Sequence, residues 1–145
     1  MEGEVKMEWY ELKTSTDIEN LLRIYNNFLD ATLVSYHFES GNFVDEDLVS
    51  HEFNRNNLCL LFQRLYDNPF SIEIMFEYIK LFNFFAPVGC EDSWRSEIEF
   101  AKIVKNDRWY YWTTWEDFDP DNPEHLEYND FILIQAQNVK WRIVK

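Results

Sequence analysis

Carboxylate side chains recur through residues 112–130, WTTWEDFDPDNPEHLEYND, which hold seven acidic residues and no Lys or Arg. Oxygens at alternate positions are the ligands that a calcium loop needs, together with glycine at the sixth position and glutamate at the twelfth. Counted from Asp117, the third and fifth positions are Asp119 and Asp121, but the sixth is an asparagine and the twelfth is Tyr128. We therefore predict no metal here, and a weak, irregular cation site is the less favoured alternative.

The same segment has two other interpretations. Pro120 and Pro123 cannot donate the hydrogen bonds of a strand, which is typical of a solvated connection between two strands. Alternatively, concentrated negative charge speeds encounter with a positively charged surface, and neighbouring aromatic side chains supply contact anchors. On this second interpretation the partner-binding residues are Trp112, Trp115, Glu116, Asp117, Asp119, Asp121, Glu124 and Tyr128.

The rest of the sequence shows no pattern of a catalytic or metal site. The histidines, at positions 37, 51 and 125, are scattered, whereas zinc needs three or four converging ligands. Cys59 lies inside the apolar run LCLLF, where a thiol behaves as a small hydrophobic group. No GxSxG, P-loop or GxGxxG pattern occurs. We predict that the protein is not an enzyme and uses no cofactor.

Four consecutive aromatic residues, WYYW at 109–112, offer a second candidate surface. On a strand, Trp109 and Tyr111 face one way, and Tyr110 and Trp112 face the other. One of these faces is a candidate platform for a small ligand, although aromatic side chains more often fill a core. Core filling is the favoured interpretation.

Acidic residues outnumber basic ones by 27 to 13, so the net charge is −14 at pH 7. A field of this sign repels phosphate backbones and anionic membrane surfaces, and it favours a basic protein as the partner. The first residues lack the pattern of an export signal, and no apolar run has the length of a membrane span. We therefore predict a cytoplasmic protein with reduced cysteines, and neither nucleic-acid nor membrane partners.

Residues 16–30 have the apolar spacing of one helix face. Apolar side chains fall at i, i+3, i+4, i+7, i+10 and i+11 from Ile18, which predicts an amphipathic helix. Thr16, followed three residues later by Glu19, has the form of a capping box, and Asp17 suits the positive end of the helix dipole.

Beyond the helix the apolar residues alternate with a period of two, which predicts strands. Residues 40–42 (SGN) and the pair 106–107 (ND) are predicted turns, and 137–138 (QN) is predicted to join the last two strands. The continuous apolar run at 58–65 predicts a central strand covered on both faces. The first strand is expected from Ala31 onward, in TLVSYHFES (32–40), and the others at 48–53, 58–65, 71–85, 97–105, 108–115, 131–136 and 139–145.

Short turns join these strands, so the helical crossovers that parallel strands require are excluded. We predict a single globular domain, residues 1–145, of the α+β class. One N-terminal helix packs on a mainly antiparallel, curved β-meander of about six to eight strands.

A family resemblance covers roughly the last two-thirds of the chain. It rests on LCLLFQRLYDNPFSIEIMFEYIKLFNF (58–84), WYYWTTWEDFDP (109–120) and the closing VKWRIVK (139–145). In its F-Q-R, D-N-P and K-W-R elements and its W/D/D cluster, the chain resembles a group of small, uncharacterised bacterial proteins. The resemblance brings no established activity and implies a single bacterial cytoplasmic domain.

Small acidic bacterial proteins without catalytic motifs are often immunity proteins, which neutralise a toxin encoded beside them. We therefore expect a non-enzymatic acidic binding protein, such as an immunity-type protein that neutralises a basic toxin. One alternative is a small-ligand-binding domain that uses an aromatic sheet face. Another is a structural subunit of a homo-oligomer that pairs through an exposed strand edge. The sequence leaves the oligomeric state open.

Overall fold

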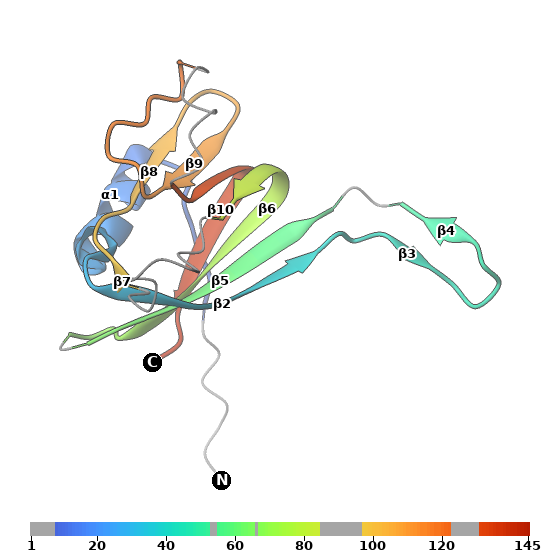
Figure 1. Cartoon of the computed structure of the whole chain (residues 1–145), viewed down its shortest axis with the longest axis horizontal. Coiled ribbons are helices and arrows are strands. Elements are labelled where there is room, and N and C mark those ends of the chain that lie inside the picture. The colour runs from blue at the N-terminus through green and yellow to red at the C-terminus, as the bar shows by residue number, and fades with distance from the viewer. Residues whose placement is uncertain (1–7, 53–54, 66, 85–96, 123–130) are drawn as a thin grey trace, which may run out of the picture.

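The computed structural model describes residues 8–52, 55–65, 67–84, 97–122 and 131–145. Within these residues, one α-helix near the N-terminus accompanies a set of strands joined mostly by short connections, which confirms the predicted α+β class (Figure 1). The elements in chain order are β1 (Tyr10–Glu11), α1 (Ser15–Ile24), the 3-10 turn η1 (Asn26–Phe28), β2 (Ala31–Glu39), β3 (Phe43–Val44), β4 (Ser50–His51), β5 (Asn57–Arg64), β6 (Ser71–Asn83), β7 (Glu97–Ile98), β8 (Lys102–Lys105), β9 (Tyr110–Thr113) and β10 (Leu133–Ile143).

All strand pairings among the described residues are antiparallel, as predicted. The main sheet runs in the order β7-β2-β5-β6-β10-β9-β8, and β1 pairs with the far end of β10. The short strands β3 and β4 form a separate hairpin. The sheet is strongly curved. The helix α1 packs beside β8, the strand at one end of the sheet order (Figure 1).

The segment 97–105, predicted as one strand, is two strands on opposite edges of the sheet. β7 pairs with β2 at one edge, and β8 pairs with β9 at the other. Three residues, 99–101, join them, and so short a segment spans at most about 14 Å from Ile98 to Lys102. The two edges must therefore lie close together, which curls the sheet around its core.

The helix begins earlier and ends earlier than predicted. Thr14, not Thr16, is the N-cap: its hydroxyl accepts from the Asp17 amide, and the Asp17 carboxylate accepts from the Thr14 amide at 2.9 Å. The capping box is therefore real but lies two residues upstream of the predicted one. α1 ends at Ile24 because the following residues enter a left-handed turn, with φ of 49° at Asn26 and 53° at Asn27.

This left-handed turn places Phe28 in the centre of the core. Phe28 has φ of 64°, a conformation that an aromatic residue rarely adopts, yet its side chain is fully buried. Its ring lies 5.1 Å from that of Phe62 and 5.6 Å from that of Trp112. The burial of a large aromatic side chain in these contacts offsets the backbone strain. The apolar spacing predicts Phe28 on the buried face of a helix, but α1 ends at Ile24 and Phe28 lies beyond it.

The central strand β5 is covered on one face only. Leu58, Leu60 and Phe62 are fully buried, whereas Cys59 is partly exposed on the opposite face. The prediction of burial on both faces is therefore wrong. β5 lies inside the sheet, between β2 and β6, but only one of its faces is buried.

β6 is the longest strand, as predicted, but it bends at Tyr78, where φ is 56°. The side chain of Asn56 braces this bend, because it accepts from the Ile79 amide at 2.6 Å and donates to the Ile79 carbonyl at 3.2 Å. Beyond the bend, Phe84 stacks on Tyr36 of β2 at 4.6 Å between ring centroids.

Two connections also differ from their predictions. The hairpin between β8 and β9 exists, but its loop is the four residues 106–109, closed by a hydrogen bond from Asn106 N to Trp109 O. The predicted joint at 137–138 is not a turn: β10 runs without a break from Leu133 to Ile143, with a bulge after Gln135.

The predicted turn at 40–42 does not reverse the chain. The chain instead continues outward through β3, turns back at residues 45–49 and returns through β4. We call residues 40–52 the arm and residues 43–51 its tip. Figure 1 shows the arm reaching away from the rest of the molecule.

Candidate functional site

The acidic segment after β9, residues 114–122, is a structured loop, which we call the acidic loop. Its first residues continue the sheet, because the Thr114 amide donates to the Ile132 carbonyl and the Ile132 amide donates to the Thr114 hydroxyl. Farther along, the Lys102 ammonium donates to the carbonyls of Glu116 at 2.6 Å and Phe118 at 2.8 Å. One lysine from β8 therefore fixes the backbone of the acidic loop.

The aromatic side chains around the acidic loop point inward. Trp112 is fully buried against Phe28 and Phe62, which corrects the expectation that its ring anchors a partner. Phe118 is buried beside Tyr111, with 5.2 Å between ring centroids. Trp115 is partly buried and stacks on Phe131 at 5.2 Å. These rings hold the acidic loop to the sheet and leave little aromatic surface for a partner.

The acidic side chains of the loop point outward. All four carboxylates in the described part, those of Glu116, Asp117, Asp119 and Asp121, are exposed. Asp119 accepts from the Asp121 amide at 2.9 Å, so the carboxylates stand on a turn of defined shape. The other two predicted contact residues, Glu124 and Tyr128, lie outside the described residues.

The part of the chain that the structure describes contains no group of three or more His, Cys, Asp or Glu side chains arranged to hold a metal ion. Asp117, Asp119 and Asp121, whose alternate spacing resembles that of a calcium loop, are among the residues that form no such group.

The WYYW run packs on both of its faces. Tyr110 and Trp112 belong to the main core, whereas Tyr111 joins a second apolar cluster with Phe118 and Leu133, against which Trp109 packs. The alternation of the four rings is as predicted. Core filling is confirmed, and neither face is an open platform.

The thiol of Cys59 lies on the outer face of the sheet beside Glu73. Its Sγ donates to the Glu73 carboxylate at 3.1 Å, and Glu73 also accepts two hydrogen bonds from Arg142. Burial raises the pKa of Cys59 to about 12, and the adjacent carboxylate acts in the same direction. A thiol with this pKa is protonated at neutral pH and is a poor nucleophile. The other cysteine, Cys90, lies outside the described residues.

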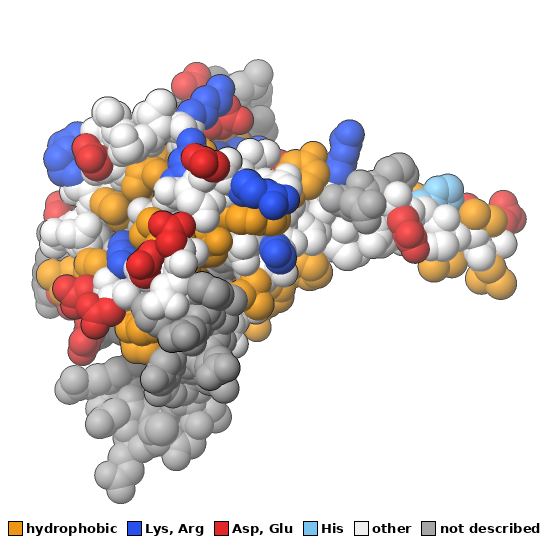
Figure 2. Space-filling view, turned by 90° about the horizontal axis from the view of Figure 1, so that it is seen from above, with side chains coloured by type: hydrophobic (Ala, Val, Ile, Leu, Met, Phe, Trp, Pro, Cys, Tyr) orange, Lys and Arg blue, Asp and Glu red, His pale blue; other side chains and the backbone are white. Residues whose placement is uncertain are grey.

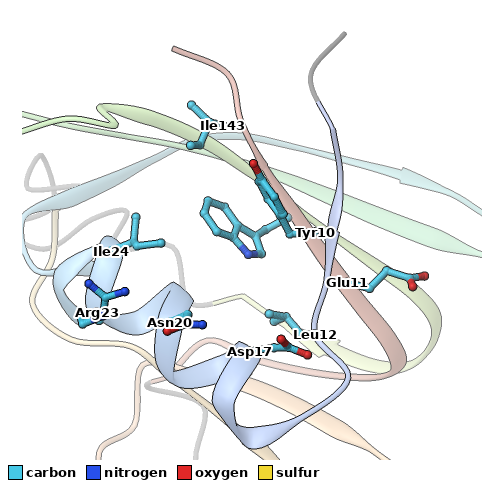
Figure 3. Close-up of a pocket in the computed structure, with 9 residues that line it drawn as sticks. Tyr10, Glu11, Leu12, Asp17, Asn20, Arg23, Ile24 and Ile143 are labelled. Atoms are coloured by element: carbon cyan, nitrogen blue, oxygen red, sulfur yellow. The ribbon is translucent and has the colours of Figure 1, made fainter.

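A hollow of about 350 Å³ lies between α1 and the paired strands β1 and β10 (Figure 3). The rings of Tyr10 and Trp141, 5.2 Å apart, form its apolar side, and Arg23 on α1 lines it as well. Its volume is at the lower end of the range of small-molecule pockets, about 300–1,000 Å³. The Asp17 carboxylate at its rim is already engaged in the helix cap. Since the carboxylate best placed to bind a ligand is thus occupied, we do not assign the hollow a ligand.

The arm is a second surface that the sequence-based prediction missed. Its tip carries four apolar side chains of which more than half the surface is exposed, and Leu48 is 85% exposed. Acidic side chains accompany them, and Figure 2 shows hydrophobic and acidic side chains together at the end of the arm. The exposed apolar residues of the tip are Phe43, Val44, Leu48 and Val49. The signal available in the sequence was DED at 45–47 followed by two apolar residues.

No family model matches this chain, and neither a curated protein nor a solved structure matches it. Within the described residues, no helix is both long and apolar enough to cross a membrane.

Proposed function

We propose that this chain is a non-enzymatic acidic binding protein whose partner is a basic protein. The observation that carries the proposal is the acidic loop, in which Lys102 and the buried Phe118 fix the backbone that carries four exposed carboxylates. A preorganised group of like charges attracts an opposite surface without first having to be ordered. The net charge of −14 extends the same field over the whole molecule.

The specific form of this proposal is an immunity-type protein that neutralises a basic toxin encoded by a neighbouring gene. The two alternatives have less support. Among the described residues, the inner face of the sheet is filled by side chains such as Trp112, Phe62 and Phe76, so this face offers no open aromatic platform to a ligand. The terminal strands β7 and β8 are two and four residues long and offer only short edges. Because β7 pairs with β2 only at Ala31 and Thr32, the longer edge available to a second copy among the described residues is the rest of β2.

Co-expression of the tagged chain with the product of each neighbouring gene tests the proposal. We expect one basic product to co-purify, and we expect the affinity of the purified complex to fall steeply between about 50 and 300 mM NaCl because salt screens exposed charges. Charge reversal of Asp117, Asp119 and Asp121 to lysine should weaken the complex at least about tenfold. The control reverses three exposed acids elsewhere, Glu19, Glu99 and Asp107, and so makes the same change in net charge.

Two results decide the matter. If the acidic-loop variant binds like the control variant, the contact does not lie on the acidic loop. If the complex is insensitive to salt and to both sets of substitutions, the basic-partner proposal is wrong.

A further inference from the structure

The tip of the arm carries large apolar side chains that contribute little to the fold. Leu48 is 85% exposed, and its neighbours Val44 and Val49 are more than half exposed. An isolated exposed apolar residue is common on protein surfaces, but a group at the end of a projecting hairpin is typical of an interaction site. We infer that the tip of the arm docks into an apolar pocket of a basic protein partner, with Leu48 as the central anchor. This inference rests on the proposed function.

The backbone at Leu48 gives an independent reason. Leu48 has φ of 65°, in the left-handed region that favours glycine or asparagine and that a leucine rarely adopts. A strained leucine inside a core would be explained by burial, as for Phe28. At Leu48 no burial offsets the strain, so the fold alone gives no reason for a leucine at this position. Strained residues of this kind cluster at functional sites, and here the observed strain points to contact with a partner.

The tip is also preorganised for binding. One carboxylate, that of Asp45, organises the turn: it accepts from the amides of Asp47 at 2.9 Å and Val49 at 3.0 Å. Its second oxygen lies 2.8 Å from Nε2 of His51 across the hairpin. The Phe43 ring stacks on the His51 ring at 4.6 Å, which holds the two strands of the arm together. A tip fixed in this way presents Leu48 with a small loss of entropy on binding.

The root of the arm is anchored in the body by aromatic contacts. Phe38 of β2 lies 5.5 Å from Phe82 of β6, and Tyr36 stacks on Phe84 at 4.6 Å. These contacts lie beyond the bend at Tyr78, which brings the end of β6 toward β2. The arm therefore extends from a packed base, and these contacts restrict its orientation relative to the rest of the molecule.

The charge on the arm identifies the chemistry of the partner. No Lys or Arg occurs between residues 24 and 54, whereas the tip alone contains Asp45, Glu46 and Asp47, and Glu52 follows it. In Figure 2 the far end of the arm shows hydrophobic, acidic and histidine side chains but no Lys or Arg. A pocket that accepts this tip must combine an apolar floor with a basic rim, because like charges facing each other are destabilising. The same charges disfavour a phosphate backbone or an anionic membrane.

A second copy of this chain is a poorer occupant. Each copy carries a net charge of −14, so two copies repel one another. Several of its cations are also engaged within the molecule: Arg64 is buried, Arg142 pairs with Glu73, and Lys102 holds the acidic loop. Charge complementarity therefore favours a different, basic protein.

A random dodecapeptide library displayed on phage tests the inference with a defined probe. The immobilised chain is used to select peptides, and the enriched sequences are synthesised and titrated against variants. The test variant is Leu48→Asn, since asparagine tolerates the left-handed conformation and removes the apolar side chain. The matched control is Leu65→Asn, which changes another leucine, 67% exposed, that directly follows the end of β5 opposite the arm. Leu48→Ala and the acidic-loop variant complete the set.

We expect enriched peptides in which Lys or Arg flanks large apolar residues. Both Leu48 variants should weaken their binding at least about tenfold, and Leu65→Asn should change it less than about twofold. Basic peptides that lose affinity only with the acidic-loop variant would overturn the role of the arm and leave the proposed function standing. Peptides without basic residues, bound equally at 50 and 300 mM NaCl, would overturn the proposed function and this inference together.

Two further measurements exclude the other occupants. Sedimentation equilibrium that shows a dimer lost in Leu48→Asn would assign the tip to a second copy. Leu48-dependent binding to neutral phosphatidylcholine vesicles would assign it to a lipid surface. Either result overturns the inference, as does a library in which no enriched peptide depends on Leu48.

Discussion

Gly41 lies so close to Arg55 that a Cβ atom on the glycine would come within 2.9 Å of the arginine carbonyl oxygen. This approach joins the outgoing and returning segments at the root of the arm. Gly41 also has φ of 77°, which side chains disfavour. The glycine that resembles an ordinary turn residue in the sequence therefore allows two backbones to pass closely, and the direction of the arm depends on it.

Replacement of this glycine should loosen the arm without unfolding the body. We expect Gly41→Ala to speed amide hydrogen exchange in β3, β4 and the 45–49 turn by about tenfold, because the left-handed φ costs about 1–2 kcal/mol. Exchange in β5, β6 and β10 should stay unchanged. Val44→Ala, an exposed change on the same arm, serves as the control. Unaltered exchange in Gly41→Ala would show that the arm does not require the close approach.

Substitution of the capping threonine distinguishes the observed N-cap of α1, Thr14, from the predicted one, Thr16. Thr14→Ala removes the hydroxyl that accepts from the Asp17 amide, and we expect it to lower the free energy of unfolding by about 1 kcal/mol. Thr16→Ala should have a clearly smaller effect, since Thr16 is an exposed residue in the first turn of α1. Urea denaturation of both variants measures the difference. A larger loss in Thr16→Ala would contradict the cap at Thr14.

The same cap predicts a pH dependence. Hydrogen bonds from the amides of Thr14 and Lys13 lower the pKa of Asp17 below its usual value. Because the folded pKa is depressed, this stabilisation is fully present above the usual pKa and is lost as the pH falls through the folded one. Asp17→Asn should therefore destabilise the protein at pH 7, and the difference from the wild type should shrink at pH 3. Thermal melts at both pH values test this. A difference of equal size at both would exclude a role for the ionised carboxylate.

Arg64 is a buried cation that should be structural. Its guanidinium donates to the carbonyls of Pro69 and Ile24, both at 3.0 Å, and lies 4.2 Å from the centre of the Tyr25 ring. Arg64→Met keeps much of the volume but leaves two partly buried carbonyls without their donor, so we expect a loss of about 2–4 kcal/mol in urea denaturation.

Arg108→Met is the control for this change, because Arg108 is exposed at the loop between β8 and β9, and it should shift stability by less than about 0.5 kcal/mol. Equal effects of the two substitutions would contradict the assigned role of Arg64.

The thiol of Cys59 should resist alkylation. A pKa of about 12, against the ordinary 9.0, lowers its thiolate fraction about a thousandfold at a given pH. In a Cys90→Ser background, we expect iodoacetamide at pH 8 to react with the native protein at least about a hundredfold more slowly than with the protein in guanidinium chloride. Glu73→Gln should raise the native rate, since it removes the adjacent negative charge. Equal rates in the folded and unfolded protein would contradict the placement of the thiol.

Local patterns predicted much of the fold because they record which side of a strand is buried. The alternation through the WYYW run placed Tyr110 and Trp112 in one core and Tyr111 in the other cluster. The antiparallel arrangement followed from the short connections between strands. These inferences need only the period of a strand and the reach of a turn.

Features that depend on distant contacts could not be predicted in this way. The break between β7 and β8 arises because the two edges of the curled sheet meet, which no local pattern records. The helix ends early because Phe28 enters the core through a left-handed turn. The arm was missed because Ser40-Gly41-Asn42 has the composition of a reversal, whereas the actual reversal is organised by the side chain of Asp45.

The candidate site was predicted in part. The outward carboxylates of the acidic loop agree with the expected acidic surface, although their role in binding stays a prediction. Trp112 was assigned to the same surface because it adjoins the acidic residues in sequence, yet strand alternation turns its ring into the core. The sequence pattern predicts Leu48 at the start of a strand (48–53), whereas Leu48 lies in a left-handed turn before β4 and is exposed there.

The rate of association measured against salt tests the central claim, a basic partner, most directly. A fluorescent copy of the tightest peptide from the library is mixed with the wild type in a stopped-flow instrument between 20 and 300 mM NaCl. We predict that the association rate constant falls at least about tenfold over this range, because screening removes the attraction between opposite charges. A rate constant that stays flat over the same range would contradict the account.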